Sequence, residues 1–559
     1  MRLPDDTKKL TSQATDIVEI CRTSVGQRAT AYNSYRQWIE NGRGAGGLAL
    51  ANMLYAHLDR LQSHLFSPSH LRFSIDFENF YPKLTHKQGE AVARLITREW
   101  ERKSIDLVFG AGVRLGLDYG CGIGKLLVTR GDVPQCHARL VAPWQFGVYN
   151  EAVDSVEDQE ACVETLFLNR HEVWRRVAHL PEADKLYKRI LAHSNKGASV
   201  STPPSFAHQV LSTAILDTSL ANATRPIPGG IVQLSNDPSN VTLGPQIDAE
   251  LFPMHELWVK DDERNDWLTI QIIEPDILVA PLLKRVNLFC PDTLPYTKIQ
   301  PNHVAGYFWG RSEIVDLIML QDLLTTHLDD VKRLMGQQFD KLLAFSGFTG
   351  LTDKVYGEFR AQGFLAMEQG AQVNDLTPKI PEFALPFIAQ ILQLMDRVAG
   401  FDNILSGRGE QGVRAGSHAD SLQRMASPRL RDRALLVERQ CAVMGDKTLS
   451  AFEAKDARAW FPNEKQDEVE AFLISQLPED RRLVVDSHSS SPIYEENHQQ
   501  IVAFLLKAGV IDGASALELL NVPNLDVLLQ RLEEQQAAKA KFLQEHPELA
   551  MQKGGKKAA

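Results

Sequence analysis

The feature that most constrains the fold is a long amphipathic pattern that follows Gly310. Apolar residues three or four positions apart predict a helix; they are Ile314, Leu317, Ile318, Leu324, Leu328, Val331 and Leu334. Ser312 is a suitable N-cap and Gly336 a suitable end for this helix. About 24 residues at 1.5 Å each give a rod of about 36 Å, whose apolar face needs a partner.

A second helix is predicted after a glycine-rich interval. The runs FSGFTG and QGFLAMEQG favour short strands, and Pro381 is placed to open a helix that ends at Gly400. Further glycines follow at 407, 409, 412 and 416. A third helix is predicted from near Ser417, and Pro428 inside it is expected to cause a kink.

The rest of the chain mixes helical and strand periods, which predicts an α+β fold. Helical spacing dominates residues 1–105, and strands such as Leu126–Thr129 and Arg139–Val148 are expected from 106 onward. We interpret Asn169–His193 as a polar helical stretch and 195–245 as a long loop or insertion. Further predictions are strands up to residue 300 with a hairpin turn near Asp261–Asn265, a strand–helix–strand unit at 459–485, and short helices at 494–535.

Composition argues against several classes of protein. The 559 residues carry a net charge of -11, so the basic footprint of a protein that grips nucleic acid is absent. The 6 cysteines lack paired spacing, and we interpret them as buried thiols of a cytosolic product. The sequence indicates no signal peptide, no membrane span and no cluster of metal ligands. We therefore expect no metal and no cofactor.

One glycine-rich motif keeps an enzymatic alternative open. The segment Leu117–Gly124, LDYGCGIG, resembles the first motif of S-adenosylmethionine-dependent methyltransferases, in which glycines let the backbone approach the cofactor. That motif precedes a helix, whereas a strand is predicted after Gly124, so a glycine-rich hairpin bend is favoured. No Gly-x-Ser-x-Gly motif indicates a nucleophile. We expect no catalytic residue, with a methyltransferase built on Asp118–Gly124 as the alternative.

Arginines crowd the glycine-rich stretch and the third helix, at positions 408, 414, 424, 429, 431 and 433. Asp402, Glu410, Asp420 and Asp432 lie among them, so ion pairing within or between subunits is the simpler interpretation. The other interpretation is that some of these arginines face a polyanion.

The order of parts between 250 and 535 resembles the portal, or head-to-tail connector, proteins of tailed bacteriophages. The likeness starts in the strands ELWVKDD and WLTI and continues through LPYTKIQPNHVAGYFWGRSEIVDLIMLQDLL. In that run, Gly310-Arg311-Ser312 stands where the first stem helix of a portal begins. Residues 106–175 resemble the portal wing more loosely, and 195–245 depart from the family as an insertion.

The resemblance implies a portal-type subunit with a mixed α/β wing, a two-helix stem, a small α/β clip and a helical crown. Its parts would be the wing at 1–310 (helical 1–105, β-rich 106–310), the first stem helix at 311–341, the clip at 342–381, the second stem helix at 382–400, the tunnel loop at 401–417, a kinked wing helix with returning strands at 418–490, the crown at 491–535 and a flexible tail at 536–559.

The resemblance also implies the function. About twelve copies would form a ring at one capsid vertex of the virion, after synthesis in the host cytoplasm. Double-stranded DNA would pass through the ring without sequence reading, during packaging and ejection. The implied partners are terminase, head–tail adaptor and tail proteins, and a capsid or scaffold protein. A ring-forming virion or scaffold protein without a DNA channel is a further alternative.

Site residues are expected in two places. The tunnel loop would present Ile404, Leu405, Arg408 and Arg414 to the DNA channel. The subunit interface would contain Leu317, Leu324 and Glu410. An acidic ring suits a duplex that must slide, because each Lys or Arg contact with a phosphate adds affinity.

Overall fold

The computed structural model describes residues 6–44, 48–68, 71–129, 135–197, 252–262, 266–274, 276–280, 292–339, 343–346, 372–400, 428–462, 469–485 and 502–508, with short pieces at 226–227, 230–231, 289–290 and 510–511 and single residues at 4, 513 and 516. Helices make up 52% and strands 22%, so the predicted α+β class is confirmed. None of the described helices is long and apolar enough to cross a membrane.

Two antiparallel sheets form the centre of the body. The larger has the strand order β10-β9-β8-β5-β4 and the smaller the order β11-β2-β3. The strands are β2 (Gly122–Thr129), β3 (Gln135–Val141), β4 (Phe146–Val148), β5 (Ala161–Leu168), β8 (Phe252–Asp261), β9 (Asp266–Ile273), β10 (Ile277–Ala280) and β11 (Tyr296–Ile299). Asp261 pairs with Asp266 in register, which confirms the predicted hairpin.

Helices cover the larger sheet on both faces, because successive side chains of a strand point to opposite sides. On one face, Val18 and Cys21 of α1 (Thr7–Asn41) pack with Leu257 and Leu268. On the other face, α5 (Arg170–Val177) and α6 (Ala183–Gly197) pack on Met254 and neighbouring residues. These two helices lie in the stretch predicted as polar and helical.

A buried charged cluster joins the two sheets. Lys125 of β2 donates to Glu164 of β5 at 2.8 Å and to Glu256 of β8 at 2.5 Å. Tyr296 of β11 donates to Glu164 at 2.9 Å, and Trp258 donates to Glu256 at 2.9 Å. Because each buried charge has partners of opposite sign or hydrogen-bond donors, the sheets are held in one relative position.

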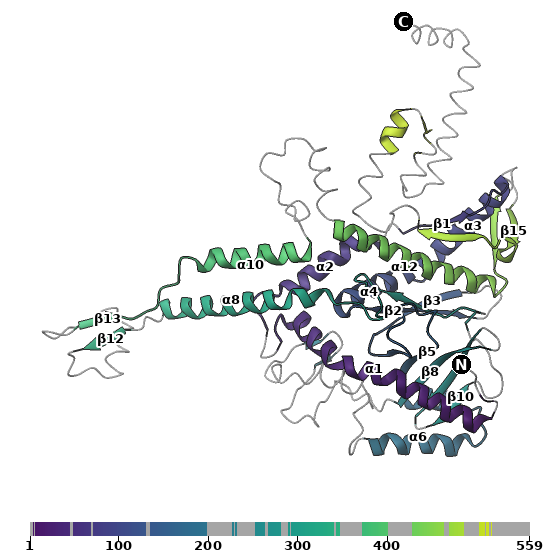
Figure 1. The fold of residues 1–559 in the computed structure, drawn as a ribbon, viewed down its shortest axis with the longest axis horizontal. Coiled ribbons are helices and arrows are strands. Elements are labelled where there is room, and N and C mark those ends of the chain that lie inside the picture. The colour runs from purple at the N-terminus through teal and green to yellow at the C-terminus, as the bar shows by residue number, and fades with distance from the viewer. Residues whose placement is uncertain are drawn as a thin grey trace, which may run out of the picture.

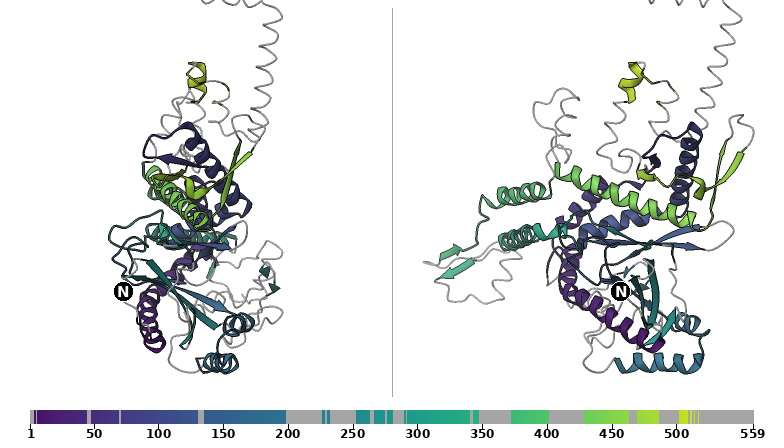
Figure 2. Two further views of the ribbon diagram at one scale, coloured as in Figure 1. Left: turned by 90° about the vertical axis from the view of Figure 1, so that its right-hand side faces the viewer. Right: turned by 45° about the vertical axis from the view of Figure 1, so that its right-hand side comes forward.

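An arm of two antiparallel helices projects from this body, as Figure 1 and the right-hand view of Figure 2 show. It consists of α8 (Ile318–Phe339), the hairpin of β12 (Leu343–Ser346) and β13 (Gln372–Asp375), and α10 (Ala384–Ala399). The first helix was predicted to end at Gly336 but runs to Phe339. The second helix and its C-cap, Gly400 with φ 82°, agree with the prediction.

Three helices of the body pack around the root of the arm. They are α2 (Met53–Leu65), α4 (Ile105–Tyr119) and α12 (Pro428–Glu453). The far end of the body contains α3 (Lys83–Arg102), a two-stranded sheet of β1 (Phe73–Phe77) and β16 (Arg481–Val485), the hairpin of β14 (Arg458–Pro462) and β15 (Val469–Leu473), and the short η5 (Ile474–Gln476) (Figure 1). The strand–helix–strand prediction for 459–485 is confirmed in part: the short η5 lies between the strands β15 and β16, but a further strand, β14, precedes them. The predicted part of the third helix before Pro428 lies outside the described residues.

The prediction that strands replace helices from 106 onward is wrong for residues 106–119, which form α4. Glycines at 110, 112 and 116 disguised this helix, because glycine weakens helix propensity. Two of them are required by close packing. A Cβ on Gly112 would lie 2.4 Å from Ile299 Cδ1, and one on Gly116 would lie 2.4 Å from Pro301 Cδ.

Candidate functional site: the projecting arm and its root

The arm lies partly inside the body and partly outside it. In α8, Leu317 just before its start and then Gln321, Leu324 and Thr325 are buried, whereas none of the described residues from Thr326 to Gln338 is buried. In α10 only one stripe, Ile391, Met395 and Ala399, is buried. The two helices contact each other where the His327 ring meets the Phe387 ring edge-on at 4.7 Å.

The arm exposes large apolar side chains. They are Met319 (77% exposed), Leu323, Met335, Leu376, Phe383 (66%), Leu385 (68%) and Leu394. Scattered exposed apolar residues are common, but here they lie on two neighbouring helices and the strand end that joins them. A concentration of this kind is typical of an interaction surface.

Where the arm enters the body, the chain passes through a very narrow gap. A Cβ on Gly310 would lie 2.3 Å from the carbonyl oxygen of Gly120, and one on Gly120 would lie 2.4 Å from that of Gly310. Gly120 also ends α4 in the left-handed conformation with φ 93°. Ser312 then donates to the carbonyl of Asp118 at 2.6 Å and caps the 3-10 turn η4 (Glu313–Asp316).

Two buried polar side chains fix the first turns of α8. Gln321 donates to the carbonyl of Ala51 at 2.8 Å and accepts from the amide of Met53 at 3.0 Å. Thr325 donates to the carbonyl of Gly42 at 3.4 Å. Both residues lie in the otherwise apolar stripe of the predicted helix, and a polar residue in such a stripe is the sequence signal that could have identified this anchor.

The helix α10 is held through Asp396. Its carboxylate lies 3.7 Å from Arg60 and 3.9 Å from His57, both on α2. His57 is 3% exposed, and burial lowers its pKa from 6.5 although Asp396 acts in the opposite direction. This contact places a titratable group exactly where the second arm helix meets the body.

The helix α12 meets the arm root through a buried ion pair. Arg433 Nη2 lies 2.8 Å from Glu313 Oε2, and the two side chains are 8% and 3% exposed. Asn302 donates to the same carboxylate oxygen at 2.8 Å. Displacement of α12 would separate Arg433 from Glu313 and leave both charges buried without a counter-charge, which is costly. The positions of α12 and of the arm root are therefore coupled.

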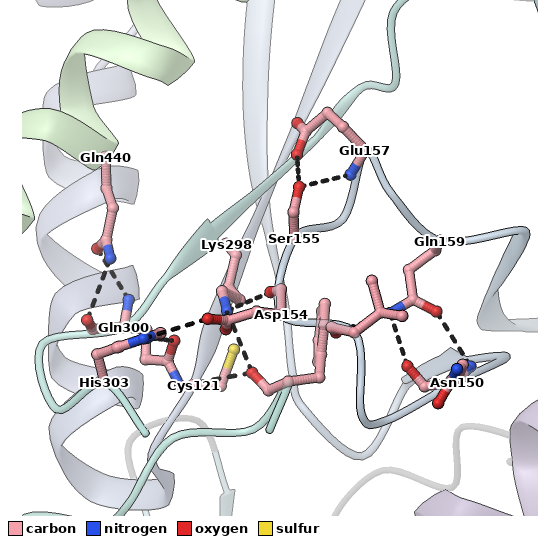
Figure 3. A network of polar contacts seen from close by, with 12 residues as sticks. Cys121, Asn150, Asp154, Ser155, Glu157, Gln159, Lys298, Gln300, His303 and Gln440 are labelled. Atoms are coloured by element: carbon pink, nitrogen blue, oxygen red, sulfur yellow. Dashed lines mark hydrogen bonds and ion pairs between the residues drawn. The ribbon is translucent and has the colours of Figure 1, made fainter. Parts of the chain in front are cut away.

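A polar network clamps the segment between β11 and the arm (Figure 3). Gln440 of α12 accepts from the amide of Gln300 at 2.9 Å and donates to its carbonyl at 3.1 Å. Lys298 donates to Asp154 at 2.8 Å, and His303 lies 3.1 Å from the other oxygen of the same carboxylate. The backbone that leads into the arm is therefore held from both α12 and the 150–159 loop.

The glycine-rich segment at 117–124 forms part of the arm root, where it joins the end of α4 to the start of β2. Asp118 and Tyr119 end a helix, and Gly122 starts a strand, so the order is helix, turn, strand. A methyltransferase motif has the reverse order, and the predicted hairpin bend is also wrong in detail. Asp118 pairs with Arg114 at 2.8 Å, while burial raises its pKa to about 6. A Cβ on Gly122 would lie 2.3 Å from the carbonyl oxygen of Gly112.

The predicted interface leucines lie elsewhere than expected. Leu317 and Leu324 are each 1% exposed and belong to the main core cluster, so the assignment of these two side chains to a subunit interface is corrected. Their helical stripe faces the chain's own body. The remaining predicted site residues, Ile404, Leu405, Arg408, Glu410 and Arg414, lie outside the described residues.

The predicted burial of the cysteines is confirmed, since all six are buried, and none of them forms a disulfide bond. No model of a known protein family matches the chain, and no curated protein matches it either.

Proposed function

We propose that this chain is the subunit of a portal ring, which forms the DNA channel at one capsid vertex. In this proposal the arm is the stem, with the β12–β13 hairpin belonging to the clip, and the body is the wing. The observation that carries the proposal is the arm itself: two antiparallel helices that leave a mixed α/β body, joined at their outer end by a hairpin and bearing exposed apolar side chains.

The exposed apolar surface supports assembly through repeated copies. A heterologous contact, in which one face of a subunit meets a different face of the next, generates a closed ring when the rotation between copies closes. The arms would then line the inside of the ring and bury residues such as Met319 and Phe383 against neighbours. The described part of the arm carries both signs of charge, with Asp322, Asp329 and Asp330 opposed by Lys332 and Arg333, which suits weak contact with a moving duplex.

The root would let the ring respond to DNA. Residues 401–417, assigned to the tunnel loop by the resemblance, connect α10 to the segment that continues into α12. A push on that loop would be transmitted to α12, and through Arg433 and Glu313 to the start of the stem. Deletion of 404–413 is expected to leave rings that assemble but fail to package or retain DNA.

The first test is the native mass of the purified chain, with images of the same peak. Twelve copies of 62.5 kDa predict a particle of about 750 kDa with a central pore of duplex width. A ring whose centre is closed would favour the alternative virion or scaffold protein. A monomer in the presence of its capsid and scaffold proteins would contradict the proposal.

A further inference from the structure

A single phenylalanine is displayed at the far end of the body from the arm. Phe80 lies between β1 and α3 and is 106% exposed, the largest value among the exposed apolar residues of the described chain. Exposure of a complete aromatic ring to water is costly, at about 25 cal/mol per Å² of apolar surface. Such a ring on a held backbone is typical of an anchor that another surface receives.

Both neighbours of Phe80 in the chain are held by one distant residue, Asp480. Asp480 accepts from the amide of Asn79 at 3.1 Å, from the Asn79 side chain at 2.7 Å and from the hydroxyl of Tyr81 at 2.8 Å. The carbonyl of Asp480 also accepts from the amide of Glu78 at 3.4 Å. The loop is therefore ordered before any partner arrives, which lowers the entropic cost of binding.

A pocket that suits this ring lies at the other end of α3. It is a cavity of about 570 Å³ between the last turns of α3 and the start of β14. Its described lining combines apolar surface from Leu95, Phe452, Ala457 and Trp460 with the charged residues Arg98, Glu99, Arg102, Lys455, Asp456 and Arg458. Trp460 is 55% exposed and offers its ring to an incoming aromatic side chain.

The charges around the two features are complementary. Exposed Glu78 lies two residues before Phe80, and exposed Glu479 directly precedes Asp480, whose carboxylate holds the Phe80 loop. At the pocket, Glu99 is engaged by Arg102 at 2.7 Å, which leaves Arg98, Lys455 and Arg458 against Asp456 alone. The two glutamates beside the apolar knob can therefore pair with the basic residues that line the apolar pocket.

The two features cannot meet within one chain. They lie at opposite ends of α3, whose 20 residues span about 30 Å. A knob at one end and its pocket at the other is the arrangement of a heterologous contact, which repeats from copy to copy and closes into a ring when the rotation allows. A self-complementary contact would pair only two copies.

We infer that Phe80 of one copy inserts into the pocket between α3 and β14 of the next copy, as a wing-to-wing contact of the ring. The inference rests on the proposed ring and adds the partner and the direction of one contact. Phe80 stacks on Trp460 of the neighbour. Glu78 and Glu479 of the first copy face Arg98 and Arg458 of the second.

Cysteine cross-linking tests the contact in the full-length chain. The natural cysteines are all buried, so a short bismaleimide reports on introduced cysteines. The double variant Phe80→Cys, Trp460→Cys is expected to give a ladder of covalent oligomers. Each single variant is expected to give monomers, and a mixture of the two single variants only dimers. A full-mass ring without a ladder would overturn this contact and leave the ring intact, whereas failure of the wild-type chain to form a ring would overturn the proposed function itself.

Charge reversal supplies an independent test of direction. Arg98→Glu is expected to raise the concentration needed for assembly by about tenfold, and Glu78→Arg should raise it similarly. Combining the two variants should recover most of the loss. Arg94→Glu is the matched control, because Arg94 is exposed on the same helix but does not belong to the described lining. Equal loss in Arg98→Glu and Arg94→Glu, with no recovery in the combination, would overturn the inference.

Discussion

Gly310 approaches Gly120 so closely that a Cβ on either residue would overlap the carbonyl oxygen of the other, at 2.3 and 2.4 Å. This crossing is where the arm begins, directly before Ser312 and η4. The position of the stem in the proposed portal ring therefore depends on two glycines that lie almost two hundred positions apart in the chain.

Substitution of either glycine by alanine should damage the arm root. We expect Gly120→Ala and Gly310→Ala to lower the free energy of unfolding by roughly 2 to 4 kcal/mol, because the methyl group has no space and Gly120 has φ 93°. Thermal or denaturant unfolding measures the loss. Gly336→Ala is the control: its Cβ would meet nothing within 4 Å, and helix propensity predicts a gain of about 0.5–1 kcal/mol. An unharmed Gly310→Ala chain would contradict the described crossing.

Substitutions of Arg433 and Glu313 should have coupled effects on the free energy of unfolding. We expect Glu313→Gln or Arg433→Met alone to cost about 3–5 kcal/mol, because each leaves one buried charge without its counter-charge. The double variant Glu313→Leu, Arg433→Met should cost clearly less than the sum of the single costs. A double-mutant cycle on unfolding free energies measures this coupling.

An exposed ion pair on the same turn provides the comparison. Arg311 pairs with Asp316, and both side chains are largely exposed at 55% and 40%. We expect Asp316→Asn to change stability by less than about 1 kcal/mol. Equal effects of Asp316→Asn and Glu313→Gln would show that burial does not determine how much an ion pair at the arm root contributes to stability.

The stability of the folded chain should fall in mild acid because of buried His57. Because burial lowers the pKa of His57 below 6.5, the unfolded chain takes up a proton before the folded chain does as the pH falls. The contribution of this site to stability is therefore complete above about pH 6.5 and declines below it. We expect His57→Gln to unfold with a smaller change in midpoint between pH 7.5 and pH 5.5 than the wild type.

The control for this pH effect is His171→Gln, at an exposed position on α5. It should retain the wild-type change in midpoint over the same interval. If His57→Gln and His171→Gln behave alike, the pH response originates in other groups.

Charged substitutions on the arm should distinguish the side chains that are needed for folding from those that are needed for assembly. Leu317→Asp and Leu324→Asp are expected to prevent stable folding, because both side chains are 1% exposed. Met319→Glu and Leu394→Glu lie on the exposed surface and should keep the unfolding midpoint of the wild type while abolishing ring formation. Native mass and thermal unfolding, measured on the same samples, distinguish the two outcomes. Rings formed by Met319→Glu with Leu394→Glu would place the subunit contact elsewhere.

Local patterns in the sequence predicted the strongest elements of the fold. Three elements follow from periodicity, capping and turn chemistry. They are the helix that contains Leu324, the second arm helix with its cap at Gly400, and the hairpin at Asp261–Asp266. These signals act over a few residues, so they can be recognised in the sequence without knowledge of the fold. The burial of every cysteine follows in the same way from residue type and spacing.

Other features depended on contacts between distant segments. The strand β1 exists because Phe73–Phe77 pairs with Arg481–Val485, more than 400 positions later, and no local pattern records such a pairing. The helix α4 carries glycines that lower its own propensity, because Ile299 and Pro301 need the space. The same applies to Leu317 and Leu324: periodicity identified an apolar face, but only the tertiary structure decided that the chain's own body covers it.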